Sequence, residues 1–200
     1  VGYPKGAIWE YLMTLANSNY EDWRLANPNE DIDNFKFSFS KMSKAGALFD
    51  MVKLADVSKN YICRLSAEEV YEMVTDWAKE NNKKLYKLLV DDEEYAKAIF
   101  AIERGNAKPR KDISAWTDVE NYVSYFYSEL WDRKFDFPDN LSNDDMIEIL
   151  ELYKQIYDEN VSSDDWFPQV RDMAETIGYA KAPKVYKKDP DSYKGHVGDV

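Results

Sequence analysis

Apolar residues recur at helical spacing along most of the chain. Pro4 suits the first turn of a helix, and Ile8, Leu12 and Leu15 follow it on one face. Residues 66–82 repeat the pattern with Val70, Met73, Val74 and Trp77. We find no alternation of apolar and polar residues of the kind a strand needs, and no internal repeat. The pattern therefore predicts an all-α fold.

Local signals predict where several of these helices begin and end. A side-chain oxygen before the first turn caps free backbone N–H groups, and a glycine accepts the left-handed geometry that follows a last turn. The predicted markers are Asp50 as a cap, Ser66 with Glu69 and Thr117 with Glu120 as capping boxes, and Gly105 and Gly178 as closing residues.

Composition limits the classes of function. The net charge of −12 makes the surface as a whole a poor match for nucleic acid, and no stretch approaches the roughly 18 apolar residues of a membrane span. The single Cys63 cannot form an internal disulfide, which fits a reducing cytosol. We therefore expect a cytoplasmic protein with neither a membrane nor DNA as its partner.

Residues for catalysis or metal binding are scarce. The lone His196 excludes a Ser-His-Asp triad and a His-rich metal site, and one cysteine excludes zinc held by Cys pairs. The acid pairs at 91–92 and 164–165 fit helix N-termini, where acids favour the macrodipole, better than acid/base chemistry. We expect no catalytic residue and no metal site in this chain.

Positive charge gathers in two islands. The first contains Arg104, Lys108, Arg110 and Lys111 without an acid; the second contains Lys181, Lys184, Lys187 and Lys188, with Lys194 beyond. Cations in loops between helices suit contacts to phosphates and base edges, and the nearby Trp116 and Tyr186 could stack on unpaired bases. The alternative is that the islands are solvated loops and the aromatic residues belong to the core.

Residues 41–44 read Lys-Met-Ser-Lys, which resembles the ATP-handling signature of class I aminoacyl-tRNA synthetases. That chemistry needs a nucleotide-binding α/β domain and a His-x-Gly-His element, and this sequence contains neither. We interpret the match as a coincidence, with Lys41 and Lys44 flanking a turn before a helix, from where they could touch a tRNA backbone.

Several longer motifs resemble the glutamyl-tRNA synthetases of bacteria. Segments "GYPKGAIWEYLMTLANS", "SKAGALFDMVKL" and "NYICRLSAEEV" are similar to the part of that family after its catalytic loop, and "KPRKDI" before "YVSYFY" is similar to its arginine-bearing loop. "WFPQVRDMAETIGYA" and "YKKDPDSYKGHVGDV" resemble the tail of the clostridial-type branch. The resemblance covers essentially the whole chain and places residues 41–44 well after the family's catalytic loop.

The resemblance implies three regions. Residues 1–62 would end a helical stem-contact region, residues 63–136 would form a first anticodon-binding helical domain, and residues 137–200 a second one, cut before its final helices. The resemblance implies that Arg110 matches an arginine that, in some family members, reads the third anticodon base. A planar guanidinium suits that role because it can hydrogen-bond a base edge bidentately.

The implied function is tRNA binding within a ligase that joins glutamate to tRNA(Glu), with tRNA(Gln) as a further candidate partner. ATP and magnesium would be handled by a catalytic domain N-terminal to this fragment, which would itself be no enzyme. The expected tRNA contacts are Arg110, Lys108, Lys111, Arg104, Lys187, Lys188 and Lys194, with Lys41 and Lys44 as stem contacts. The alternative is an acidic all-α protein-interaction module that binds no RNA.

Overall fold

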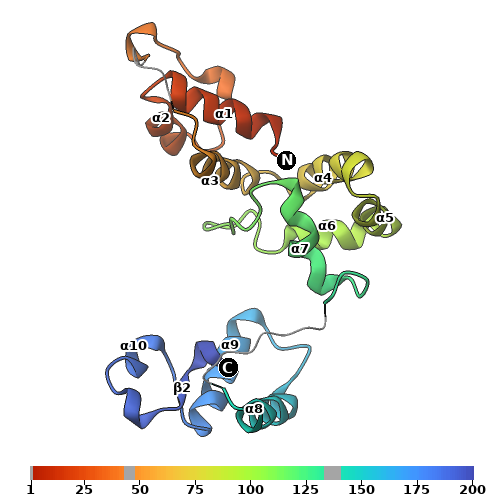
Figure 1. Cartoon of the computed structure of the whole chain (residues 1–200), viewed down its shortest axis with the longest axis vertical. Helices are drawn as coiled ribbons and strands as arrows, with labels where there is room; N and C mark the ends of the chain where they lie inside the picture. The colour runs from red at the N-terminus through yellow and green to blue at the C-terminus, as the bar shows by residue number, and fades with distance from the viewer. Residues whose placement is uncertain (1, 43–47, 133–140) are drawn as a thin grey trace. The chain divides into compact units, whose positions relative to one another are not determined.

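The computed structural model describes residues 2–42, 48–132 and 141–200 (Figure 1). The chain divides into two compact units, residues 1–132 and residues 133–200. Within the described parts, helices dominate and the only sheet is a two-stranded one, so the predicted all-α class is confirmed.

The first unit begins with three helices, α1 (Lys5–Ala16), α2 (Tyr20–Ala26) and α3 (Met51–Ile62). Two 3-10 turns, Ile32–Asn34 and Phe39–Lys41, lie between α2 and α3. α1 packs on α3 through a small core of Tyr11, Leu54 and Val57. Gly6 permits this approach, because a Cβ there would lie 2.4 Å from the Tyr61 ring.

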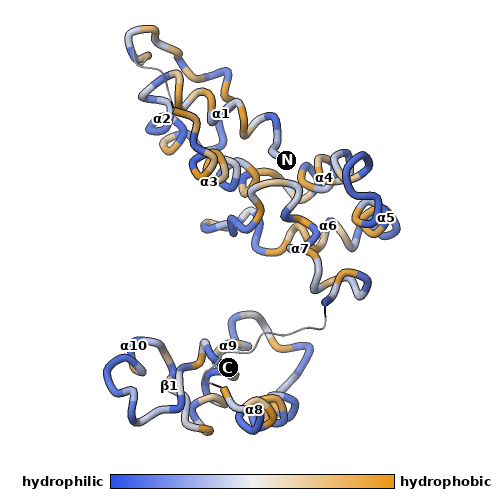
Figure 2. Tube along the Cα trace, in the orientation of Figure 1, coloured by the Kyte–Doolittle hydropathy of each residue, from blue (hydrophilic) through white to orange (hydrophobic). Residues whose placement is uncertain are grey.

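The rest of the first unit holds its larger core. It comprises α4 (Ala67–Asn81), α5 (Lys83–Asp91), α6 (Glu93–Ala101) and the short α7 (Val119–Val123), flanked by 3-10 turns at Trp116–Asp118 and Ser124–Phe126. Figure 2 shows hydrophobic segments in these helices, and fully buried members of the core include Val74, Leu85, Leu89 and Phe100. The backbone N–H of Trp116 donates to the carbonyl of Gly2 at 2.8 Å, which ties the N-terminal segment to this core.

The second unit is smaller. Helices α8 (Asn143–Ile156) and α9 (Ser163–Thr176) are followed by strand β1 (Tyr179–Ala180), helix α10 (Pro183–Tyr186) and strand β2 (Gly195–His196), with 3-10 turns at Pro190–Ser192 and Val197–Asp199. The strands are parallel, with Tyr179 opposite Gly195. Buried Ile149, Met173 and Tyr179 belong to the core of this unit.

Several predicted helix boundaries are confirmed. The carboxylate of Asp50 accepts hydrogen bonds from the N–H groups of Val52 and Lys53 at the start of α3. Ser66 and Glu69 form the reciprocal capping box of α4. Gly178 follows α9 with a φ of 92°, the left-handed geometry that favours glycine. Each of these signals involves residues at most a few positions apart.

Two predicted boundaries are wrong. Helix α6 ends at Ala101, well before Gly105, because the backbone leaves helical geometry at Ile102, whose ψ is 120°. Glu103 then turns the chain with a φ of 52°. The cap predicted for Thr117 is supplied by Asp118, whose carboxylate accepts from the N–H groups of Ser114 and Ala115 and from the Ser114 hydroxyl. Burial opposes ionisation of Asp118, but these hydrogen bonds outweigh it and lower its pKa.

The structure also bears on the stacking role suggested for Trp116 and on the expected absence of strands. Trp116 is only 4% exposed and lies in the core, so it is not available to stack on a base. The parallel pair β1–β2 was not visible in the sequence, because a two-residue strand is too short to alternate.

Two domain boundaries were predicted, after residues 62 and 136. The structure divides the chain at residue 132, near the second of them. Residue 62, the first, is the end of α3 and lies inside the first compact unit. The roles assigned to the three regions stay predictions.

Candidate nucleic-acid interface

The first basic island lies in an irregular loop between α6 and the turn at Trp116. Glu103 and Gly105 both adopt left-handed backbone geometry, and the Asn106 side chain accepts from the N–H of Lys108 at 2.9 Å. Pro109 then restricts the backbone, and Ile113, 4% exposed, anchors the far end in the core. The loop is thus held at both ends and turned outward between them.

Arg110 projects from this loop, with 60% of its side chain exposed. Its Nε lies 2.6 Å from a carboxylate oxygen of Asp112 and 3.7 Å from one of Glu103. The Asp112 hydrogen bond raises the pKa of the guanidinium. A guanidinium carries five N–H donors, and contacts through Nε leave its terminal nitrogens at the outer end. Asp112 and Glu103 therefore hold the guanidinium of Arg110 through Nε, and its two terminal nitrogens lie farther from the backbone.

Lys108 and Lys111 are exposed beside it. Lys111 and Pro109 line a recess of about 380 Å³, whose other walls include Leu25 of α2 and Val57 of α3. The loop that carries Arg110 therefore lies against the helices at the start of the chain, within the same unit.

Arg104 is a correction to the predicted set of RNA contacts. Its guanidinium donates to the carbonyl oxygens of Phe100 at 2.8 Å, Ile62 at 2.7 Å and Leu65 at 3.1 Å. Burial of this side chain lowers its pKa. Arg104 binds the ends of α3 and α6 together, and its charge serves the fold because its donors are directed at backbone acceptors.

The three lysines of the second unit that were predicted to contact tRNA differ in their surroundings. Lys187 and Lys188 are exposed just after α10. Lys194 instead places its Nζ 3.0 Å from Asp145 and 3.2 Å from Glu148, and these hydrogen bonds raise its pKa. The Tyr186 ring packs edge-on against the His196 ring, with centroids 6.0 Å apart. Lys187 and Lys188 are thus the better placed of the three lysines to meet a phosphate.

Of the two predicted stem contacts, Lys44 lies outside the described residues. Lys41 ends the 3-10 turn Phe39–Lys41 and is exposed, while its carbonyl accepts from the N–H of Ser18 at 3.2 Å. Thr14, Ser18 and Ser40 line an open recess of about 430 Å³ beside it.

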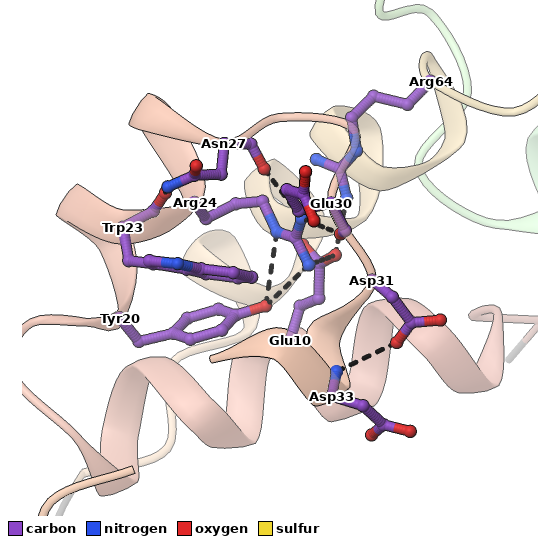
Figure 3. A network of polar contacts seen from close by, with 9 residues as sticks. All are labelled: Glu10, Tyr20, Trp23, Arg24, Asn27, Glu30, Asp31, Asp33 and Arg64. Atoms are coloured by element: carbon purple, nitrogen blue, oxygen red, sulfur yellow. Dashed lines mark hydrogen bonds and ion pairs between the residues drawn. The ribbon is translucent and has the colours of Figure 1, made fainter. Parts of the chain in front are cut away.

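A buried ionic cluster behind the loop was not expected from the sequence. Glu10 of α1 is 5% exposed, and its Oε1 lies 3.1 Å from Nη2 of Arg24 and 2.6 Å from Nη2 of Arg64. Figure 3 shows both guanidinium groups directed at this carboxylate. Because Arg24 lies on α2 and Arg64 follows α3, the cluster joins three helices.

Arg24 makes further contacts in the cluster. It donates to the carbonyls of Asn27 at 3.0 Å and Glu30 at 2.6 Å, and its guanidinium lies 4.8 Å from the Trp23 ring centroid. Burial raises the pKa of Tyr20, although the hydrogen bond from Arg24 acts in the opposite direction and lowers it. A glutamate inside the apolar face of α1 was the one signal of this cluster in the sequence.

Among the described residues, no three His, Cys, Asp or Glu side chains lie close enough together to hold a metal ion. Nor does any helix in these ranges have the length and apolar character needed to cross a membrane.

Comparison with known proteins gives relatives of one kind. The glutamate–tRNA ligase of Acetivibrio thermocellus is 44% identical over 200 residues, which is all of this chain and 37% of the relative. Those of Clostridium perfringens strain 13 and Sorangium cellulosum are 42% and 43% identical, again over the whole chain and over 37% and 35% of their lengths. No family profile and no solved structure matches the chain.

The chain is related to the glutamate–tRNA ligases. The resemblance stated from its motifs is thereby confirmed, over an alignment that covers the whole chain. The chain spans little more than a third of the length of these relatives.

Proposed function

We propose that this chain is the tRNA-binding, anticodon-recognising portion of a longer glutamate–tRNA ligase. The observation that carries the proposal is identity of 44% across all 200 residues to a ligase of which these residues make up 37%. A predominantly helical fold with an exposed loop of cations supports it. The reaction itself, with ATP and magnesium, belongs to the remainder of the longer polypeptide, and the protein acts in the cytoplasm.

The loop between α6 and α7 is the proposed reader. Arg110, oriented by Asp112, presents its outer nitrogens to the third base of the anticodon, while Lys108 and Lys111 hold the phosphates on either side. Lys187 and Lys188 supply phosphate contacts from the second unit. The substrate is tRNA(Glu), and tRNA(Gln) is the second tRNA that the same loop would meet.

The salt dependence of RNA binding tests the proposal. Each single-stranded phosphate that a cation neutralises contributes about −0.7 to the slope of log K against log salt concentration. The four lysines assigned to phosphates, two in the loop and two in the second unit, therefore predict a slope of about −2.8 for a labelled anticodon stem-loop of tRNA(Glu), measured by fluorescence anisotropy. A flat curve would contradict the proposal and favour the acidic interaction module.

A separate measurement tests whether amino-acid activation requires the part of the longer polypeptide outside residues 1–200. Purified residues 1–200 should show no ATP–pyrophosphate exchange with glutamate, because the sequence has no nucleotide-binding α/β pattern. Exchange above the rate of a blank preparation would mean that the chain itself performs amino-acid activation.

A further inference from the structure

A recess of about 380 Å³ lies between the first three helices and the loop that carries Arg110. Pockets that hold small molecules in proteins measure roughly 300–1,000 Å³, and their lining is mostly apolar with a few converging polar groups. The apolar lining of this recess comes from α2 and the turn after it, from α3 and from the loop: Leu25, Pro28, Val57 and Pro109. The recess therefore has the size and the walls of a site for a small organic molecule.

One polar group that lines the recess has unused hydrogen-bonding capacity. The guanidinium of Arg64 carries five N–H donors, yet within the described residues its only acceptor is Glu10, which it meets through Nη2 at 2.6 Å (Figure 3). The guanidinium lies 5.7 Å from the centroid of the Tyr61 ring, and the side chain is only 18% exposed. A guanidinium fixed in this way suits a planar anion such as a carboxylate, which it can bind through two parallel hydrogen bonds.

The charges around the recess leave one positive charge unbalanced. The single carboxylate of Glu10 faces two guanidinium groups, so their cluster carries one net positive charge. Glu21, another residue of the lining, pairs with Lys53. The two charged groups that remain, Asp56 and Lys111, are of opposite sign and both exposed. One carboxylate in the recess would therefore complete the balance.

The recess also adjoins the segment that holds Arg110. Pro109 and Lys111, its two neighbours in the chain, both line the recess, opposite groups from α2 and α3. A molecule in the recess would contact the loop and these helices at once. Its binding would therefore restrict the motion of the loop.

We infer that this recess binds a small organic carboxylate. An apolar, ring-sized body lies against Leu25, Val57 and Pro109, and the carboxylate accepts from the donors of Arg64 that Glu10 leaves open. Binding fixes the loop against α2 and α3. The site is additional to tRNA binding and does not depend on whether Arg110 reads a base.

Cys63 serves as a reporter, because it is the only cysteine of the chain, lines the recess and is 8% exposed. The rate of its alkylation by iodoacetamide is measured by mass spectrometry in residues 1–200, against increasing 2-naphthoate or its uncharged isostere 2-naphthamide. Saturating 2-naphthoate should slow alkylation at least fivefold, and half-maximal protection should require at least tenfold more of the amide. Hydrogen exchange of peptides from residues 102–113 should slow over the same range of 2-naphthoate concentration.

Two substitutions at one wall isolate the effect of charge. Leu25 is 81% exposed, so neither Leu25→Asp nor Leu25→Asn removes a core group. The two new side chains have nearly the same size, and the aspartate should raise the half-protecting concentration of 2-naphthoate at least fivefold above the asparagine. Val52→Asp adds the same charge at an 80% exposed position of α3 that does not line the recess, and it should leave the concentration unchanged.

Four results would contradict the inference. Alkylation of Cys63 that 2-naphthoate does not slow would mean that the compound does not enter the recess. Equal protection by the carboxylate and the amide would mean that the recess does not select an anion. An effect of Val52→Asp as large as that of Leu25→Asp would assign the selectivity to the overall charge of the chain. Protection without slower exchange at residues 102–113 would refute the restriction of the loop.

Discussion

Replacing Glu10 by glutamine tests whether the buried cluster holds the first three helices together. The substitution keeps the size and one oxygen acceptor but removes the charge that faces Arg24 and Arg64. Breaking a buried ion pair by removing one partner costs about 3–5 kcal/mol. The two arginine side chains keep 11% and 18% exposure, and Arg24 retains two carbonyl acceptors, so the cost belongs at the lower end. We expect Glu10→Gln to reduce the free energy of unfolding by about 3 kcal/mol.

The assay must resolve the two units, because a single transition is not assured in a chain that divides into two. Hydrogen exchange of peptides from residues 5–26 and 67–101, pulsed across a urea series, follows the first unit alone. With a urea dependence of about 2 kcal/mol per molar, the loss moves the midpoint down by roughly 1.5 M.

The matched control is Glu93→Gln, which removes the same charge from an exposed pair with Lys97. Its side chain is 53% exposed, and exposed pairs contribute little to stability, so its midpoint should stay near that of the unaltered chain. If Glu10→Gln shifts the midpoint no further than Glu93→Gln, the cluster does not stabilise the unit and the reasoning fails.

Three further predictions concern the loop, a helix cap and the motif at residues 41–44. In the full-length enzyme, Arg110→Gln should reduce discrimination at the third anticodon base by roughly ten- to a hundredfold in aminoacylation, whereas Lys108→Ala should weaken all tRNAs about equally; an unchanged ratio for Arg110→Gln would refute its reading role. Asp118→Asn should cost about 1–2 kcal/mol at pH 7. Because the folded pKa of Asp118 is lowered, its contribution is present above the unfolded value and is lost as pH falls through the folded one, so the difference in urea midpoints should shrink below about pH 4; a constant difference would refute the cap. Changing Lys41 and Lys44 together to alanine should leave glutamate activation nearly intact, and a loss of about a thousandfold in ATP–pyrophosphate exchange would show that they form the nucleotide loop.

What the sequence predicted correctly was local. Asp50 and Ser66 cap their helices through backbone N–H groups two or three residues away, so both caps can be recognised from neighbouring residues. The cap predicted at Thr117 failed because the turn begins two residues earlier, after Ala115. There the carboxylate of Asp118 accepts from the N–H of Ala115, and the N–H of Trp116 donates to the distant carbonyl of Gly2.

The site shows the same limit. Charge can be read from the letters, but the direction of a side chain cannot. Arg104 and Arg110 lie in one basic island, yet the first points at backbone carbonyls and the second at solvent. Glu10 and Arg64 are 54 positions apart, and only the three-dimensional packing of α1 on α3 brings them into contact.

The pairing of cations with acids bears on how so acidic a chain would select one RNA if the proposed function holds. Arg110 lies against Asp112 and Glu103, and Lys194 against Asp145 and Glu148. When a cation already faces a carboxylate, a phosphate that replaces this carboxylate adds only the difference in free energy between the two contacts. Such a cation therefore contributes little to non-specific binding of nucleic acid. The same carboxylate holds the guanidinium in place for a base edge, where hydrogen-bond geometry carries the energy. Local acids therefore weaken non-specific attraction more than they weaken specific reading.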